Sequence, residues 1–395
     1  MYKNKYQDKA FYFLLASLFF TPISAYIAIP LALTSLVLLT LSRPYFKLNL
    51  LDKLQIILLG TMILSSIFGV YKIHSFYATC ALLSYVLIYF LAKTLFIEKT
   101  RIDKFVKTIA ILIILVSTIG ILQYAARFSL VYKNISIVAP PMERTRITSI
   151  CYNPLILAAL IGFSLPILIS FLIEEKTKKL FWISVTLGII AFFLTSSRAP
   201  TVALIISLSI LFFIKKKKLI AFLMPILIML IAILYIPLRA RLLLALKEGI
   251  NTNRIISIKA GIKMWKENSV FTGVGIHNFY LLFEKYSPPE YKKGAPYVHN
   301  MYINFLAEAG ILGVSALIAV FGVAIKWSRD NFTRLKEDLN NNVYQKWLSQ
   351  GLFVAFIGIT IHNLLDNTIY VVGLGMLFWV GMGIISGIHS KKLKS

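Results

Sequence analysis

Acidic residues are scarce in this chain: sixteen Asp and Glu stand against forty-two Lys and Arg among 395 residues. Charged residues of both signs make up only 15% of the sequence, whereas an ordinary soluble domain contains about a quarter. Hydrophobic residues reach 58%, and apolar runs recur from end to end with no room between them for a soluble domain of usual size. The composition therefore excludes a soluble protein and predicts one membrane domain over residues 1–395.

Several motifs that handle phosphates or metals are missing. The sequence has no GxxxxGK[ST] loop, no HExxH, no paired-cysteine motif and no Asp-x-Asp cluster to hold a divalent metal against a diphosphate. Its two cysteines, Cys80 and Cys151, fall within or near the end of apolar runs, which excludes a disulfide framework. We expect no metal and no cofactor, so that arginine and lysine neutralise any bound phosphate.

Hydropathy predicts an all-α polytopic membrane protein with about twelve transmembrane helices. The expected spans are 11–25, 26–42, 54–71, 76–97, 106–126, 153–173, 180–197, 200–214, 219–238, 301–326, 347–366 and 369–388. Pro22 and Pro30 interrupt the first apolar stretch and mark either a hairpin or a kink. The first span follows basic residues as a signal peptide does, but no small-residue cleavage site follows it, so we interpret it as a retained helix.

Basic clusters set the orientation, because cytoplasmic loops carry an excess of Lys and Arg. With twelve spans and both termini inside, every cluster falls on one side. These clusters are Arg43, Lys47 and Lys53; Lys99, Arg101, Lys104 and Lys107; Lys176, Lys178 and Lys179; Lys215 to Lys218; Lys326, Arg329, Arg334 and Lys336; and Lys391, Lys392 and Lys394. The basic excess thus indicates a multi-pass protein of a plasma membrane and no nucleic-acid partner.

The long outer segment, residues 239–300, departs from this charge rule. It contains ten basic and four acidic residues, a net charge of +6. One interpretation is that these charges form a solvated surface, because the charge rule weakens for loops of about 60 residues or more. The other interpretation is that the segment binds an anionic partner at the outer membrane surface. Ile255, Ile258, Ile262 and Trp265 recur at helical spacing and predict an amphipathic helix lying among membrane lipids.

Three outer-side arginines are candidates for phosphate binding, since a guanidinium group matches phosphate with a bidentate fork. Arg198 lies between two apolar spans at their outer ends, Arg254 begins the predicted loop helix, and Arg146 precedes Tyr152-Asn153-Pro154 on the other outer segment. The alternative is structural: Arg198 as an interfacial arginine that reaches toward water, and Arg254 as a surface charge.

His299 is the candidate catalytic group, followed by Asn300 and Tyr302 at the outer mouth of a span. Imidazole titrates near neutral pH and can take a proton from a sugar hydroxyl, although a lone histidine also serves as a structural hydrogen-bonding residue. Asp366 ends the eleventh expected span on the same side and is the next candidate base. Glu308 is half a turn out of phase with His299, which favours a structural role beside a buried cation.

A series of short motifs runs from about residue 144 to 366. They are Arg146 with Tyr152-Asn153-Pro154; Ser196-Ser197-Arg198; Arg254 to Trp265 followed by Phe271-Thr272-Gly273-Val274-Gly275 and Asn278-Phe279; His299-Asn300-x-Tyr302 with Ala307-Glu308-x-Gly310-x-x-Gly313; and the late His362 and Asp366. Their order, spacing and shared outer location resemble the O-antigen ligase and polymerase superfamily of bacterial membrane glycosyltransferases. Pro200 departs from the small residue common there, and the first five spans carry no matching motif.

The resemblance implies an enzyme of the bacterial inner membrane that works at the periplasmic face. In its ligases, a hydroxyl of lipid A–core oligosaccharide attacks an undecaprenyl-diphosphate-linked glycan without a metal. Arg198 and Arg254 would hold the diphosphate leaving group, His299 would act as general base, and Asn300, Tyr302 and Asp366 would support it. The fuller motif match favours ligase over the polymerase of the same superfamily, while a transporter or flippase, which places charges near the midplane, is the rival of a different class.

Overall fold

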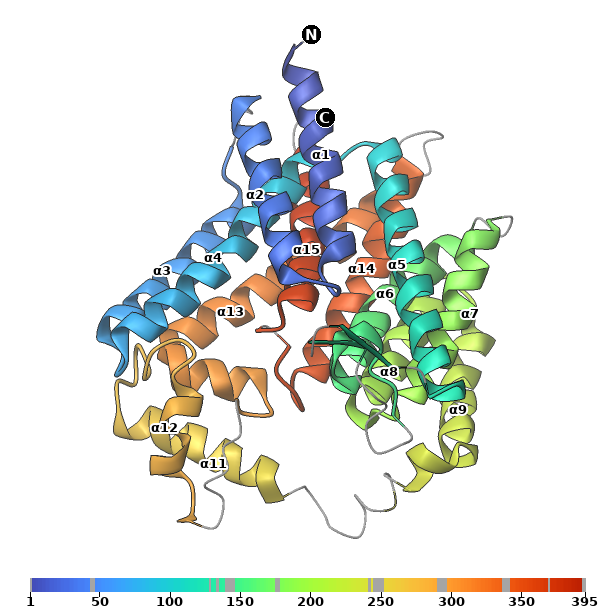
Figure 1. Cartoon of the computed structure of the whole chain (residues 1–395). Helices are drawn as coiled ribbons and strands as arrows, with labels where there is room; N and C mark the ends of the chain where they lie inside the picture. The colour runs from blue at the N-terminus through green and yellow to red at the C-terminus, as the bar shows by residue number, and fades with distance from the viewer. Residues whose placement is uncertain are drawn as a thin grey trace.

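The computed structural model of the chain is a helical bundle (Figure 1). It describes residues 2–42, 47–127, 129–132, 135–138, 146–174, 178–240, 243, 252–289, 297–335, 342–368 and 370–392. Its helices are α1 (Tyr2–Phe20), α2 (Ala25–Leu41), α3 (Leu50–Phe68), α4 (Lys72–Leu95), α5 (Lys99–Ala125), α6 (Pro154–Leu172), α7 (Lys179–Leu194), α8 (Arg198–Ile214), α9 (Lys218–Leu234), α11 (Thr252–Glu267), α12 (Phe279–Tyr286), α13 (Met301–Arg334), α14 (Asn342–His362) and α15 (Val372–Lys392). Between α5 and α6 lie a small antiparallel hairpin, β1 (Leu130–Tyr132) and β2 (Ile135–Val138), and the short helix η1 (Ser149–Cys151).

Each of the twelve expected spans overlaps a separate helix. Within the described residues, six helices are long and apolar enough to cross a membrane: α3, α4, α5, α6, α13 and most of α15. Shorter apolar helices occur in α2, α7, α8 and α9. Pro22 lies in the turn between α1 and α2, so the first apolar stretch forms a hairpin. The structure supports a polytopic helical membrane protein, and the number of spans stays a prediction.

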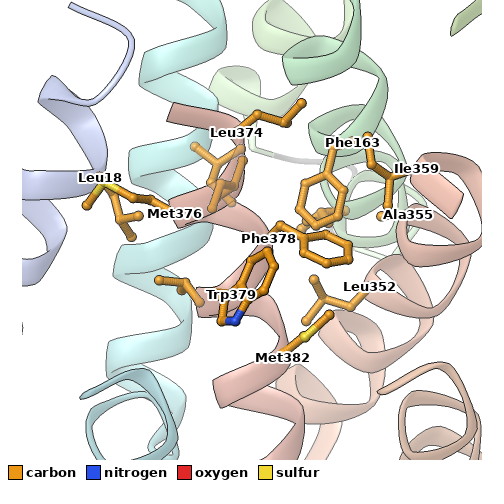
Figure 2. Close-up of a cluster of buried hydrophobic side chains, with 14 of the residues drawn as sticks. Leu18, Phe163, Leu352, Ala355, Ile359, Leu374, Met376, Phe378, Trp379 and Met382 are labelled. Atoms are coloured by element: carbon orange, nitrogen blue, oxygen red, sulfur yellow. The ribbon is translucent and has the colours of Figure 1, made fainter. Parts of the chain in front are cut away.

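The middle of the bundle is filled by aromatic side chains around α15 (Figure 2). Phe378 lies 5.8 Å from Phe163 of α6 and 5.2 Å from Phe356 of α14, measured between ring centroids. The edge-to-face angles of these pairs, 61° and 84°, are favourable for aromatic contacts. Three helices that are distant in sequence are thereby fixed against one another, and their outer ends carry the polar residues described below.

The helix ends that carry the described basic clusters, such as the starts of α5 and α7, lie at the end of the bundle that holds both termini (Figure 1); Arg43, Lys176, Lys336 and Lys394 lie outside the described residues. Ion pairs connect the helix ends there: Arg101 with Asp8 at 2.8 Å, Lys178 with Asp103 at 3.1 Å and Lys215 with Glu174 at 2.9 Å. At the opposite end lie α11 and α12 (Figure 1). This segregation is what the charge rule requires of a chain with both termini on one side of a membrane.

The opposite end is organised by a break in α13. Gly310 has φ 65° and ψ −168°, a conformation that is not helical. Segment 270–275 docks on the break through backbone hydrogen bonds: Val274 N–H to Ala307 O (2.9 Å), Gly275 N–H to Glu308 O (3.0 Å) and, in return, Ile311 N–H to Val270 O (2.9 Å). These bonds satisfy backbone groups that the broken helix leaves open. Two motifs far apart in the sequence are thus one structural unit.

The predicted loop helix is present as α11, and its position among membrane lipids stays a prediction. The buried positions are Ser257, Ala260 and Met264, whereas Ile255 and Ile262 are only half-buried. The reason is steric, because small residues let α11 approach closely: a Cβ on Gly261 would come within 2.9 Å of the Val298 side chain. The helix packs on α12 and α13 in a second hydrophobic core, against which Ile258 of the predicted apolar face also packs.

We expect Gly310→Ala to destabilise the folded protein. An added Cβ would meet Phe271 backbone atoms at 2.3 Å, and the backbone conformation alone costs a non-glycine residue about 1–3 kcal/mol. Gly322→Ala in the same helix is the control, because a Cβ there has nothing within 4 Å. Thermal unfolding of both purified variants in detergent provides the measurement, and equal melting temperatures would contradict the importance of the break.

Candidate active site

His299 is held at the start of α13 by a capped helix end. The Asn300 side chain accepts from Ile303 N–H at 3.0 Å and donates to Leu364 O at 3.0 Å. The N–H of Met301 donates to Asn363 O at 2.9 Å and to Asp366 O at 3.0 Å. These bonds connect the start of α13 to the segment that follows α14. His299 and Asp366 are brought together as a result, although the sequence separates them widely.

Asp366 lies between two imidazoles. Its Oδ1 is 3.7 Å from His299 Nδ1 and its Oδ2 is 3.5 Å from His362 Nε2. Both nitrogens are buried and have no hydrogen-bond partner among the described residues, so the carboxylate is the polar group that they face. Burial raises the pKa of Asp366, but the two histidines outweigh burial and hold that pKa below its usual range. The carboxylate is therefore charged at neutral pH.

The His299–Asp366 pair leaves one imidazole nitrogen for chemistry. Catalytic hydrogen bonds are often long in a ligand-free site and tighten when substrate binds, so a carboxylate 3.7 Å from Nδ1 is placed to accept its proton. With the proton on Nδ1, Nε2 carries the lone pair. The His299 side chain is 27% exposed while Nδ1 is buried, so the rest of the ring is accessible. The arrangement suits a general base.

Arg254 lies in the first turn of α11, on the same side of the structure as His299. Val298, directly before His299, packs in the second core with Ala260 and Met264 of α11. Tyr297 completes the connection: its ring lies 5.4 Å from that of His299, and the charges of both Asp366 and Arg254 act on its phenol. Arg254 is thus part of the same outer-end neighbourhood as the histidine.

Arg146 and Arg198 meet at the turn between α7 and α8. The buried guanidinium of Arg146 donates from Nε to Thr195 O at 3.0 Å and from Nη2 to Ser197 Oγ at 3.4 Å. Ser197 is the residue before Arg198, which opens α8 and is partly exposed. The contacts of Arg146 fit support of the turn that carries Arg198 better than direct phosphate binding.

A small cavity connects this turn to the histidines. Its lining includes Pro200 and Leu204 of α8, Phe163 of α6, and Ile359 and His362 of α14. Pro200 follows Arg198 by two positions, and His362 faces Asp366, so the cavity lies between the first turns of α8 and the histidine beside Asp366. No hydrogen bond joins Arg198 to His299 among the described residues, and the place of Arg198 in the site stays a prediction.

Two predicted residues have structural contacts. Tyr302 donates its hydroxyl to Thr360 O at 3.2 Å and packs α13 on α14. Glu308 is buried, but the expected cation is not its partner: within the described residues it accepts from Asn304 at 3.0 Å, from Phe279 N–H at 3.1 Å and from the Tyr370 hydroxyl. Its structural role is consistent with these contacts. Sequence reasoning missed Tyr297, whose position two residues before His299 was the available signal.

A separate aromatic cluster surrounds His277, which has a positive φ of 60°. Its ring lies 5.5 Å from His74, 5.3 Å from Tyr280 and 5.4 Å from Tyr370. Burial, followed by the nearby His74, lowers the pKa of His277 below its ordinary value. Tyr370 in turn donates to Glu308, so the cluster rests directly on the broken segment of α13.

The fold is that of a polytopic helical membrane protein, with a histidine–carboxylate pair, His299 and Asp366, where the start of α13 meets the segment after α14. Residues 181–318 match the model of the O-antigen ligase family, which confirms the predicted relation to the O-antigen ligase and polymerase superfamily. The matched region contains Arg198, Arg254 and His299 and ends before Asp366. None of the curated proteins compared with the chain matches it. The family is one of membrane glycosyltransferase-like enzymes.

Acidification is expected to destabilise the protein through His277. Because its folded pKa is lowered, the unfolded chain binds the proton more readily, so stability is complete above the ordinary histidine pKa of about 6.5 and falls as the pH drops below it. His277→Asn, which tolerates positive φ, should lose less stability on acidification than the wild type. Melting temperatures at about pH 7.5 and about pH 5.5 test this; equal losses in the two proteins would exclude His277 as the cause.

Proposed function

We propose that this protein is an O-antigen ligase that transfers a glycan from undecaprenyl diphosphate to a hydroxyl of lipid A–core oligosaccharide, without a metal. The observation that carries the proposal is the exposed His299 imidazole with its buried Nδ1 facing Asp366. It lies within the region whose sequence matches the O-antigen ligase family. The family match supports the proposed reaction class, and the geometry supports the proposed roles of His299 and Asp366.

In the proposed reaction, Nε2 of His299 takes the proton of the acceptor hydroxyl as its oxygen bonds to the anomeric carbon of the glycan. The bond between that carbon and the phosphate oxygen breaks, and undecaprenyl diphosphate leaves with the electron pair. Asp366 stabilises the imidazolium that forms, because its carboxylate is already charged. At the anomeric carbon the acceptor oxygen thus replaces the phosphate oxygen, and the proton of the acceptor hydroxyl ends on the histidine.

The leaving diphosphate gains negative charge, and preorganised cations stabilise it. Arg254 on α11 and Arg198 at the start of α8 are the proposed contacts, with Arg146 supporting Arg198 through the turn that it hydrogen-bonds. Lys259, Lys263 and Lys266 are exposed on α11 and add to the positive field. The net charge of the outer segment, +6, is then the property that attracts the anionic donor.

The proposed location is the bacterial inner membrane, with both termini cytoplasmic and segment 239–300 a periplasmic loop between the ninth and tenth spans. Two features support it. The basic clusters and both termini share one end of the bundle, and the histidine pair and α11 lie at the other (Figure 1). The charge rule assigns the first end to the cytoplasm.

The O-antigen polymerase of the same superfamily is the alternative, and it differs in the acceptor. A polymerase joins one lipid-linked repeat unit to another, whereas a ligase uses lipid A–core. Purified protein supplied with a lipid-linked glycan and either acceptor distinguishes the two. Product on lipid A–core supports the ligase; product only on a second lipid-linked unit supports the polymerase.

We expect His299→Ala to lose most transfer while still binding the donor, because general-base catalysis contributes about 10²–10⁴-fold. His299→Gln keeps hydrogen-bonding capacity but cannot take the proton, and should be similarly slow. Transfer rate and donor affinity are measured for both variants in folded protein. A glutamine variant with near-normal rates would show that His299 is structural and would make Asp366 the next candidate base.

Lysine should not replace Arg198 or Arg254. Loss of a bidentate fork to phosphate is expected to lower transfer by about 10-fold or more at equal expression and melting temperature. Arg239→Lys is the control, because Arg239 is an exposed arginine beyond α9 that has no place in the proposed site. Full transfer by Arg198→Lys or Arg254→Lys would remove that residue from the diphosphate site.

A further inference from the structure

Tyr297 is an outer-end residue to which neither the sequence motifs nor the family match assigns a role. Its neighbour Val298 is fully buried, and the Val298 N–H donates to Asn304 Oδ1 at 2.9 Å. This bond anchors the segment at a fixed position before α13. The aromatic ring of Tyr297 is consequently held against His299, with centroids 5.4 Å apart and planes at 70°.

The hydroxyl group of Tyr297 is available as a hydrogen-bond donor. It is only partly buried, and among the described residues no partner accepts its hydroxyl. Satisfied tyrosines nearby differ in this respect: Tyr302 donates to Thr360 O, and Tyr370 donates to Glu308. A hydroxyl beside a candidate base, without a hydrogen-bond partner among the residues that the structure describes, is placed to bind a ligand.

Two charges of opposite sign act on this phenol, Asp366 from the side of the histidine pair and Arg254 from the side of α11. Tyr297 therefore lies near both charges: its ring contacts His299, and the next residue, Val298, packs on α11, which carries Arg254. Burial and then Asp366 raise the pKa of Tyr297 to about 12, against the opposing effect of Arg254. The hydroxyl stays protonated at neutral pH and is a hydrogen-bond donor.

We propose that Tyr297 binds the substrate directly, donating its hydroxyl to a phosphate oxygen of the lipid diphosphate that Arg254 holds. This inference rests on the proposed function, and it adds a neutral donor to a site so far described by its cations. A hydrogen bond from a neutral donor to a charged oxygen is stronger than one between neutral groups. It also strengthens as the leaving group gains charge, so Tyr297 contributes to the rate as well as to affinity.

Tyr297→Phe is the test, because it keeps the ring against His299 and removes only the hydroxyl. Direct binding of undecaprenyl diphosphate to the purified protein should weaken by about 10-fold or more, and transfer should fall by at least the same factor at an unchanged melting temperature. Tyr71→Phe is the matched control, an exposed tyrosine directly before α4 that should bind and transfer as the wild type does.

The inference is overturned if Tyr297→Phe binds undecaprenyl diphosphate as tightly as the wild type. Slow transfer by Tyr297→Ala alone would then mean that the ring only packs on His299. The proposed function is tested separately, with the wild-type protein. If the wild type binds the lipid diphosphate but does not glycosylate lipid A–core, the ligase proposal is refuted. The binding comparison between the wild type and Tyr297→Phe still decides the role of Tyr297 in that case. A wild type that does not bind the lipid diphosphate refutes both.

Discussion

Ala307 and Glu308 present backbone carbonyls that α13 cannot pair internally, because the helix breaks at Gly310. Within a membrane protein such groups are costly unless another part of the protein satisfies them. Val274 and Gly275 do so, and the Glu308 carboxylate accepts the Phe279 N–H that follows them. Segment 270–275 and the start of α12 are fixed on α13 as a consequence. The packing of α11, and with it the placement of Arg254 near the start of α13, depends on this attachment.

At the end of the molecule that contains α11 and His299, two acidic residues are buried and the lysines of α11 are exposed. Asp366 and Glu308 are buried and accept hydrogen bonds or face imidazoles, whereas the lysines of α11 are exposed. An approaching anion therefore meets cations first, and the carboxylates act only on the protein groups beside them. Asp366 and Glu308 are thus withheld from the surface, whereas Glu267 and Glu284 are exposed on α11 and α12 and offset part of the positive charge there.

The sequence predicted much of the architecture, since each expected span overlaps a helix and the outer-side placement of His299 and Asp366 follows from the span ends. Their proximity was not predictable: hydropathy fixes which end of the bundle a residue occupies, but not its neighbours, and here the Asn300–Leu364 bond joins positions 64 apart. Hydropathy did not predict the burial of the small Ala260 and Gly261 on α11, because close approach of a helix depends on side-chain size. The hydrogen bonds of Arg146 to the turn before Arg198 were not predictable either, since they join segments about 50 residues apart, and a diphosphate contact of Arg146 stays a prediction.

The backbone bonds at Gly310 also bear on how the chain is assembled. Val70, at the end of α3, donates to Val274 O, and Ser65 donates to Glu308 O, so the junction unites the third helix, the outer segment and the tenth expected span. Those three parts emerge from synthesis at widely different times, and the junction closes only when all of them have reached the same side of the bilayer. A chain inserted with one span inverted keeps its individual helices but has no partner for these carbonyls. Such a chain is therefore expected to be less stable than a correctly inserted one.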